Sequence, residues 1–140
     1  MKMKQRFIAA AAGLLLTVAT LQAHHSFGAE FDGGKPTVIK GKVTKVEWVN
    51  PHSWVYVDVT DPSGKTVNWA CETAPPNVLY RQGWRRDSLK DGDEVSVDGF
   101  LAKDGSPTMN VTSVKLADGR RMFAGSAGDG RPPAKPDTKQ

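Results

Sequence analysis

The chain has 140 residues, 39% of them hydrophobic and 24% charged, which is the size of one ordinary domain. Its formal net charge is +4, but three of its 19 basic residues lie in residues 2–6, leaving 16 downstream against 15 acidic ones. Without these three the charges nearly balance and are interspersed. The basic stripe that marks nucleic-acid-binding proteins is therefore missing, and the sequence argues against nucleic acid as the partner.

The first 23 residues predict a cleaved signal peptide. The basic residues are followed by a mostly apolar run, residues 7–21, and then by the small residue Ala23. A retained membrane anchor is the alternative, but the run is short beside the roughly 20 apolar residues that a bilayer core requires. We expect an exported chain, periplasmic in a bacterium or secreted, with no membrane span after cleavage.

Residues 35–123 predict one compact β domain. The stretch 37–49 is rich in β-branched residues, but its apolar positions change parity near Thr44, which predicts a bulge or a sharp bend. Residues 54–60 and 65–72 flank the turn sequence DPSG and predict a hairpin, with the valines of the first strand facing inward.

A helix and further strands are predicted after the hairpin. Residues 73–83 predict a short helix of about two turns, capped by Thr73 and ended by Gly83. Strands are expected over 95–101 and 108–116, with RRMF as a short last strand. This order, three strands, a short helix and two strands, is that of an OB-fold, a mainly β five-stranded Greek-key barrel. The strong bend in the first strand is also typical of this fold. A β-sandwich would normally have more strands.

Two segments flank this domain. Residues 24–34 form an N-terminal segment, and residues 124–140, rich in Gly, Pro and charge, predict a disordered tail. Cys71 is the only cysteine, so an intramolecular disulfide is excluded. We expect Cys71 to be buried in a strand, the alternatives being a metal ligand, a redox site or an intermolecular link.

Three motifs carry a family resemblance: HHSF at 24–27, NPHSW at 50–54 and GWRRDSLKDGDEV at 83–95. With them the chain resembles a family of small exported bacterial proteins of unknown function, over nearly all of residues 23–126. The family's common form has no cysteine at position 71. In strand pattern alone the chain also resembles the OB-fold stress-tolerance proteins of the bacterial periplasm. The resemblance implies a compartment and a fold, but no activity.

The three histidines, His24, His25 and His52, are the candidate metal ligands. Cleavage after Ala23 would leave His24 with a free α-amine, whose reference pKa is about 8, beside its ring nitrogen. A third nitrogen from His52 would complete a histidine brace, a nitrogen-rich site that suits Cu(II). Other cleavage sites would allow chelation through His25. The alternatives are adventitious copper binding by an exposed terminus, or a His52 that only stabilises its Asn-Pro turn.

Aromatic residues offer a second kind of site. Trp54 and Tyr56 are predicted to project opposite the inward valines, with Trp48 and Trp84 nearby. Outward aromatic residues on OB barrels bind ligands by stacking, which points to a partner protein or an oligosaccharide. Alternatively, these rings pack under the N-terminal segment or the helix. The charged stretch 83–95 is interpreted as mainly structural.

Catalysis is not predicted, because the sequence has no nucleophile–histidine–acid order, paired-carboxylate motif, phosphate-binding loop or HExxH helix. The sequence therefore predicts a small exported binding protein, holding copper through His24, His25 and His52. The alternative is an interaction module without a metal role.

Overall fold

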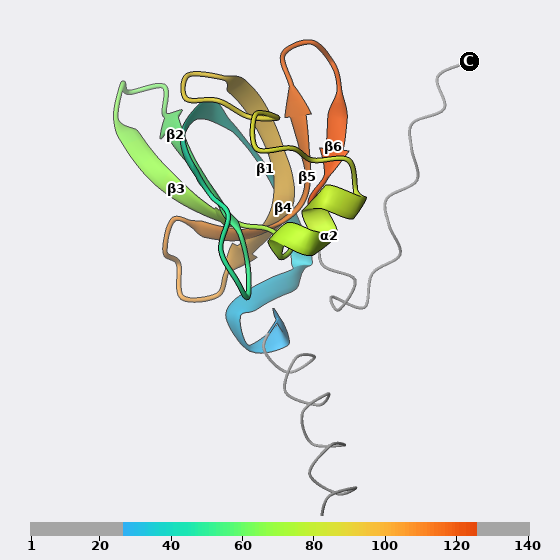
Figure 1. Ribbon diagram of the computed structural model, residues 1–140. Helices are drawn as coiled ribbons and strands as arrows, with labels where there is room; N and C mark the ends of the chain where they lie inside the picture. Colours follow the sequence, from blue (N-terminus) through green and yellow to red (C-terminus); the bar gives the residue numbers. More distant parts are fainter. Residues whose placement is uncertain (1–26, 126–140) are drawn as a thin grey trace, which may run out of the picture.

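The computed structural model describes residues 27–125, which fold into one small barrel (Figure 1). The two outer parts of the chain, with the predicted signal peptide, His24, His25 and most of the predicted tail, lie outside the described residues. A helical turn at 27–30 precedes the strands. The further elements are β1 (Phe31–Glu47), β2 (Trp54–Thr60), β3 (Thr66–Glu72), α2 (Pro76–Arg81), β4 (Glu94–Ala102), β5 (Thr108–Leu116) and β6 (Arg121–Phe123).

The strands pair in the order β3-β2-β1-β4-β5-β6, and an additional parallel pairing of β3 with β5 closes the first five into a barrel. The other pairings are antiparallel. With α2 between β3 and β4, this is the topology of an OB-fold, so the fold class predicted from the sequence is confirmed. No helix within residues 27–125 is long and apolar enough to cross a membrane.

Strand β1 serves both sides of the barrel and bends where the sequence predicted. Its first part pairs with β4, its last part pairs with β2, and the β2 register shifts between Val43 and Lys45. Close packing at the bend requires a glycine, since a Cβ on Gly41 would lie 2.1 Å from the carbonyl oxygen of Asp58. Because β1 already begins at Phe31, the barrel includes part of the predicted N-terminal segment.

The core fills the inside of the barrel with side chains from alternate positions of each strand. As predicted, Val55 and Val57 face inward and are fully buried. Cys71 is also fully buried, beside its β5 neighbour Met109. Ala124 is buried as well and its backbone bonds to Thr112, so the barrel includes the first residue of the predicted tail.

Helix α2 closes one end of the core through Leu79, its buried residue. The prediction that Thr73 caps this helix was wrong. The helix starts after Pro75 without a side-chain cap, and the Thr73 hydroxyl instead donates to the Ser53 carbonyl, 3.0 Å away. Gly83 follows the helix with φ +95°, the left-handed conformation that glycine adopts without strain.

Candidate functional site

A histidine–carboxylate pair lies at the end of the barrel where β2 starts and β3 ends. Nδ1 of His52, in the β1–β2 loop, is 3.0 Å from Oε1 of Glu72, the last residue of β3. The Glu72 side chain is only 10% exposed, while that of His52 is 36% exposed. The buried carboxylate therefore fixes the orientation of an accessible imidazole.

The contact of Nδ1 with the carboxylate bears on which ring nitrogen is available. A carboxylate, when ionised, only accepts hydrogen bonds, so its position 3.0 Å from Nδ1 favours a proton on that nitrogen. In the neutral imidazole the other nitrogen, Nε2, then carries a lone pair that can bind a metal. Within residues 27–125, the polar contact of the His52 ring is the one between Nδ1 and Glu72. The pair thus presents one oriented nitrogen ligand.

Glu72 belongs to a row of outward-facing residues that are nevertheless buried. It lies opposite Asn110 of β5, which in turn lies opposite Phe100 of β4. All three are less than 9% exposed. The side-chain oxygen of Asn110 is buried and has no hydrogen-bond partner among the described residues. A carboxylate and an amide oxygen thus lie side by side under cover on the outer surface of the barrel.

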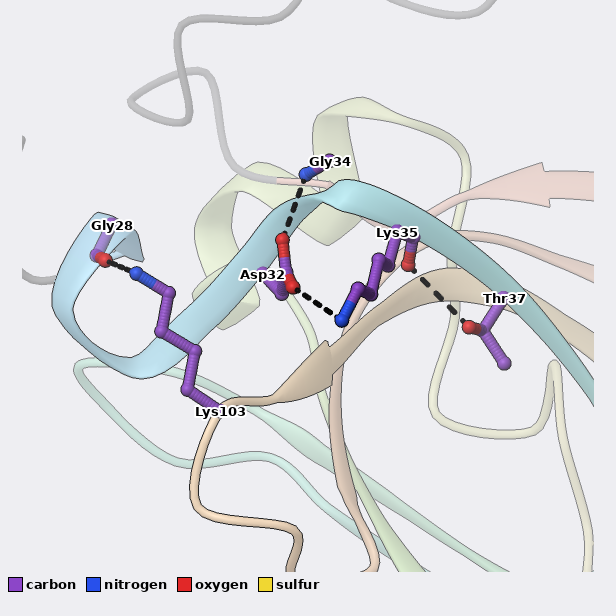
Figure 2. Close-up of polar contacts among 6 residues, drawn as sticks. All are labelled: Gly28, Asp32, Gly34, Lys35, Thr37 and Lys103. Carbon is purple, nitrogen blue, oxygen red and sulfur yellow. Dashed lines mark hydrogen bonds and ion pairs between the residues drawn. The ribbon is translucent and has the colours of Figure 1, made fainter.

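Residues 27–35, just after the predicted mature terminus, are held on this same side of the barrel by a set of contacts that we call the clasp. The ring of Phe27 contacts the rings of Phe31 and Phe100, with centroids 5.7 and 6.1 Å apart. Figure 2 shows Lys103, from the β4–β5 loop, donating to the carbonyl of Gly28. The Lys103 backbone also donates to the Glu30 carbonyl at 2.8 Å. In Figure 1 this turn and the β1–β2 loop lie at the same end of the barrel.

Two polar contacts continue the clasp into the start of β1. Oδ1 of Asp32 accepts from the Gly34 backbone at 3.1 Å, and Oδ2 lies 3.5 Å from Nζ of Lys35 (Figure 2). These contacts shape the irregular start of β1, where the register to β4 shifts before Pro36. The clasp therefore holds the chain on the barrel directly after Phe27.

Of the predicted metal ligands, only His52 lies within the described residues. In residues 27–125 no three His, Cys, Asp or Glu side chains come close enough together to hold a metal ion. Cys71 does not join His52, since it faces the opposite side of β3 from Glu72 and burial raises its pKa to about 12. A complete donor set would need the histidines at positions 24 and 25.

The four aromatic residues proposed as a ligand face do not lie on one face. Trp54 and Tyr56 point outward from β2, where Tyr56 donates to Glu47 at 3.1 Å. Trp84 is only 1% exposed and donates to the backbone carbonyl of Phe123. Trp48 packs edge-on against Trp84, because the β1 bulge turns the strand's apolar positions inward beyond Thr44.

One hollow of the barrel surface lies away from the histidine. It has a volume of about 770 Å³ and is lined by residues from the other end of the β2–β3 hairpin, including Thr60 and Thr66, and by lysines such as Lys42. Since His52 and Glu72 lie at the opposite end of this hairpin, the hollow is not part of the candidate site.

The sequence allowed Glu72, beside Cys71, to form a site with His52, but spacing alone did not support this pairing, although a usable signal was present. The DPSG turn fixes the hairpin register, which places Trp54 opposite Glu72. His52 is two residues before Trp54 and thus on the same face, diagonally adjacent to Glu72, within side-chain reach. No local sequence pattern places Asn110 beside Glu72, because their pairing depends on the closure of the barrel.

A comparison with protein families places this chain. The model of a family of unknown function, DUF6152, matches residues 13–111. The chain belongs to the DUF6152 family. The match includes His24, His25, His52, Glu72 and Asn110, and so covers the whole candidate site. No curated protein matches the chain, so membership in DUF6152 establishes a family without an assigned activity.

Proposed function

We propose that this DUF6152 protein is exported and binds one copper ion at the end of the barrel where His52 lies. His52 would supply one nitrogen, and a mature terminus at His24 would supply its α-amine and ring nitrogen, with His25 assisting. The role would be copper storage, delivery or sensing. One observation carries the proposal: a buried carboxylate lies 3.0 Å from Nδ1 of the partly exposed His52, which leaves Nε2 as the nitrogen for a metal.

The His52–Glu72 pair has the arrangement of a metal ligand and its supporting residue. Metal-binding histidines typically donate their second ring N–H to a carboxylate or a carbonyl, which fixes the tautomer and makes the ligand more basic. A histidine that only stabilised the turn would not need a buried acceptor. Cu(II) suits an all-nitrogen set and has the highest affinity among the divalent first-row metals.

Covalent geometry allows the terminus to reach His52. Glu72 and Phe100 are two strands apart, with Asn110 between them, a span of roughly 10 Å at the usual strand spacing. Phe27 is held on Phe100, and the three residues from His24 to Phe27 can span up to about 10 Å when extended. The clasp thus anchors the chain at a distance from which His24 can meet His52.

Native mass spectrometry and competitive titration test the proposal. The mature protein, starting at His24, is expected to hold one Cu(II) tightly, and His52→Ala should weaken binding strongly. His24→Ala should do the same, because both residues belong to one donor set. Each variant is checked for an unchanged unfolding temperature. If His52→Ala binds copper as tightly as the wild type, only an adventitious N-terminal chelate is present, and the proposal fails.

The alternative is an interaction module that binds a partner protein or an oligosaccharide through Trp54 and Tyr56. It is supported by the position of these two rings on the outer face of β2, where neither is fully buried. On this alternative, Trp54→Ala should abolish capture of the partner, and His52→Ala should change nothing.

A further inference from the structure

A second feature of the barrel combines two arginines with two aromatic rings. Trp48, the residue that follows β1, stacks on Tyr80 of α2 with ring centroids 5.3 Å apart. The guanidinium of Arg86 lies 5.8 Å from the centre of the Trp48 ring, and that of Arg85 lies 5.9 Å from the Tyr80 ring. We call these four residues the arginine–aromatic cluster. Stacking of this kind holds a guanidinium in place while its N–H edge stays available.

The arginines of the cluster form no ion pair with the rest of the described barrel. Within residues 27–125, neither Arg85, Arg86 nor the adjacent Arg81 has a carboxylate within ion-pair distance. The guanidinium of Arg85 already donates hydrogen bonds, through Nη1, to the carbonyls of Tyr80 and Trp84. Arg86 is exposed and makes no hydrogen bond in this part of the chain. It is therefore an oriented cation without a structural acceptor.

Apolar surface borders these charges. Tyr80 is 38% exposed and Val49, next to Trp48, is 46% exposed, which makes them two of the three large hydrophobic residues exposed among residues 27–125. Arginine and aromatic residues are enriched in protein interfaces and dominate their binding energy. The composition of this surface is thus that of a protein-binding site, whereas interpretation of the sequence had taken residues 83–95 as mainly structural.

We propose that the arginine–aromatic cluster docks a carboxylate-rich segment of a second protein. The planar guanidinium fork of Arg86 matches a carboxylate, which it can bind through two parallel hydrogen bonds. Tyr80 and Val49 would cover apolar side chains that flank the acidic residue. A sugar is the poorer fit, because the Trp48 ring already contacts Tyr80, Trp84 and a guanidinium. The proposal does not depend on the copper site.

The test uses a fluorescein-labelled peptide that alternates glutamate and leucine, titrated into the full mature protein at low ionic strength. Arg86→Gln should weaken binding about tenfold, the loss expected for a charge-assisted hydrogen bond. Arg86→Lys keeps the charge but loses the fork and should also weaken binding. Arg120→Gln is the matched control, because it removes the same charge from the exposed β5–β6 turn, where Arg120 pairs with Asp118. All variants are compared by thermal unfolding.

The proposal is supported if the two Arg86 variants lose affinity while Arg120→Gln binds within about twofold of the wild type. Chemical-shift changes in the wild type should then centre on the Trp48 indole. Equal losses in Arg86→Gln and Arg120→Gln would reduce the effect to net charge and overturn the proposal. It is equally overturned if the peptide does not bind, or if Arg86→Lys binds as well as the wild type.

Discussion

Glu72→Gln is the sharpest test of how the barrel prepares His52 for a metal. The substitution keeps the size of the side chain and an oxygen that can accept from Nδ1 of His52, but it removes the negative charge. A hydrogen bond to a charged group contributes about 1.5–3 kcal/mol and a neutral one about 0.5–1.5 kcal/mol. Because the Glu72 side chain is only 10% exposed, little water is available to compensate for the difference.

The expected loss is therefore about 1–1.5 kcal/mol, or a Cu(II) affinity weaker by roughly five- to thirteenfold. The upper end of this estimate reaches the lower end of the range, about 10–100-fold, found when a residue supporting a metal ligand is replaced. The assay is a competitive titration of the mature protein against a chelator of known Cu(II) affinity. Thermal unfolding of the metal-free protein reports separately on any loss of stability.

Glu47→Gln is the matched control. Glu47 lies in the same outward row as Glu72, with Trp54 between them. Its substitution therefore removes the same charge at a position roughly 10 Å from Glu72. It contacts Lys45 and Tyr56 rather than the histidine. Its copper affinity should stay within about twofold of the wild type. If Glu72→Gln has no larger effect than Glu47→Gln, the carboxylate does not position His52 and the reasoning is refuted.

Four further predictions concern the barrel itself. Gly41→Ala should cost about 1–3 kcal/mol in urea unfolding, since the new Cβ would lie 2.1 Å from the Asp58 carbonyl oxygen; an unchanged midpoint would contradict this packing. Cys71 should resist a maleimide until the protein unfolds, because burial raises its pKa from 9.0 to about 12. The Cys71 thiol ionises at a lower pH in the unfolded chain than in the folded protein. Its contribution to the stability of the folded state is therefore complete below pH 9 and is lost as the pH rises towards 12. Cys71→Ala should flatten this alkaline decline in stability. Trp84→Phe should cost about 2–3 kcal/mol in thermal unfolding, because it removes the donor 2.6 Å from the Phe123 carbonyl and leaves a gap in the core; a loss below about 0.5 kcal/mol would contradict both contributions.

Local patterns were sufficient to predict the barrel. The change of parity at Thr44 predicted the β1 bulge, and the DPSG turn predicted the β2–β3 hairpin. These signals are short-range, because a bulge shifts side-chain parity and a turn fixes the register of its own strands. The prediction of a Thr73 cap was wrong because the hydrogen-bond acceptor of Thr73 is far away in the sequence. Its hydroxyl bonds to the carbonyl of Ser53, twenty residues earlier, and no local pattern reveals that acceptor.

The candidate site shows the same division between local and long-range information. The sequence by itself indicated His52 as a ligand, Cys71 as a buried residue and an order of strands that closes into a barrel. Only the tertiary structure decided that Glu72 and Asn110 lie side by side, because β3 and β5 meet through barrel closure. It also separated Trp48 from Trp54 and placed Arg86 over the Trp48 ring. Those contacts join strands and loops far apart in the chain, and side-chain periodicity carries no information about which distant elements pack together.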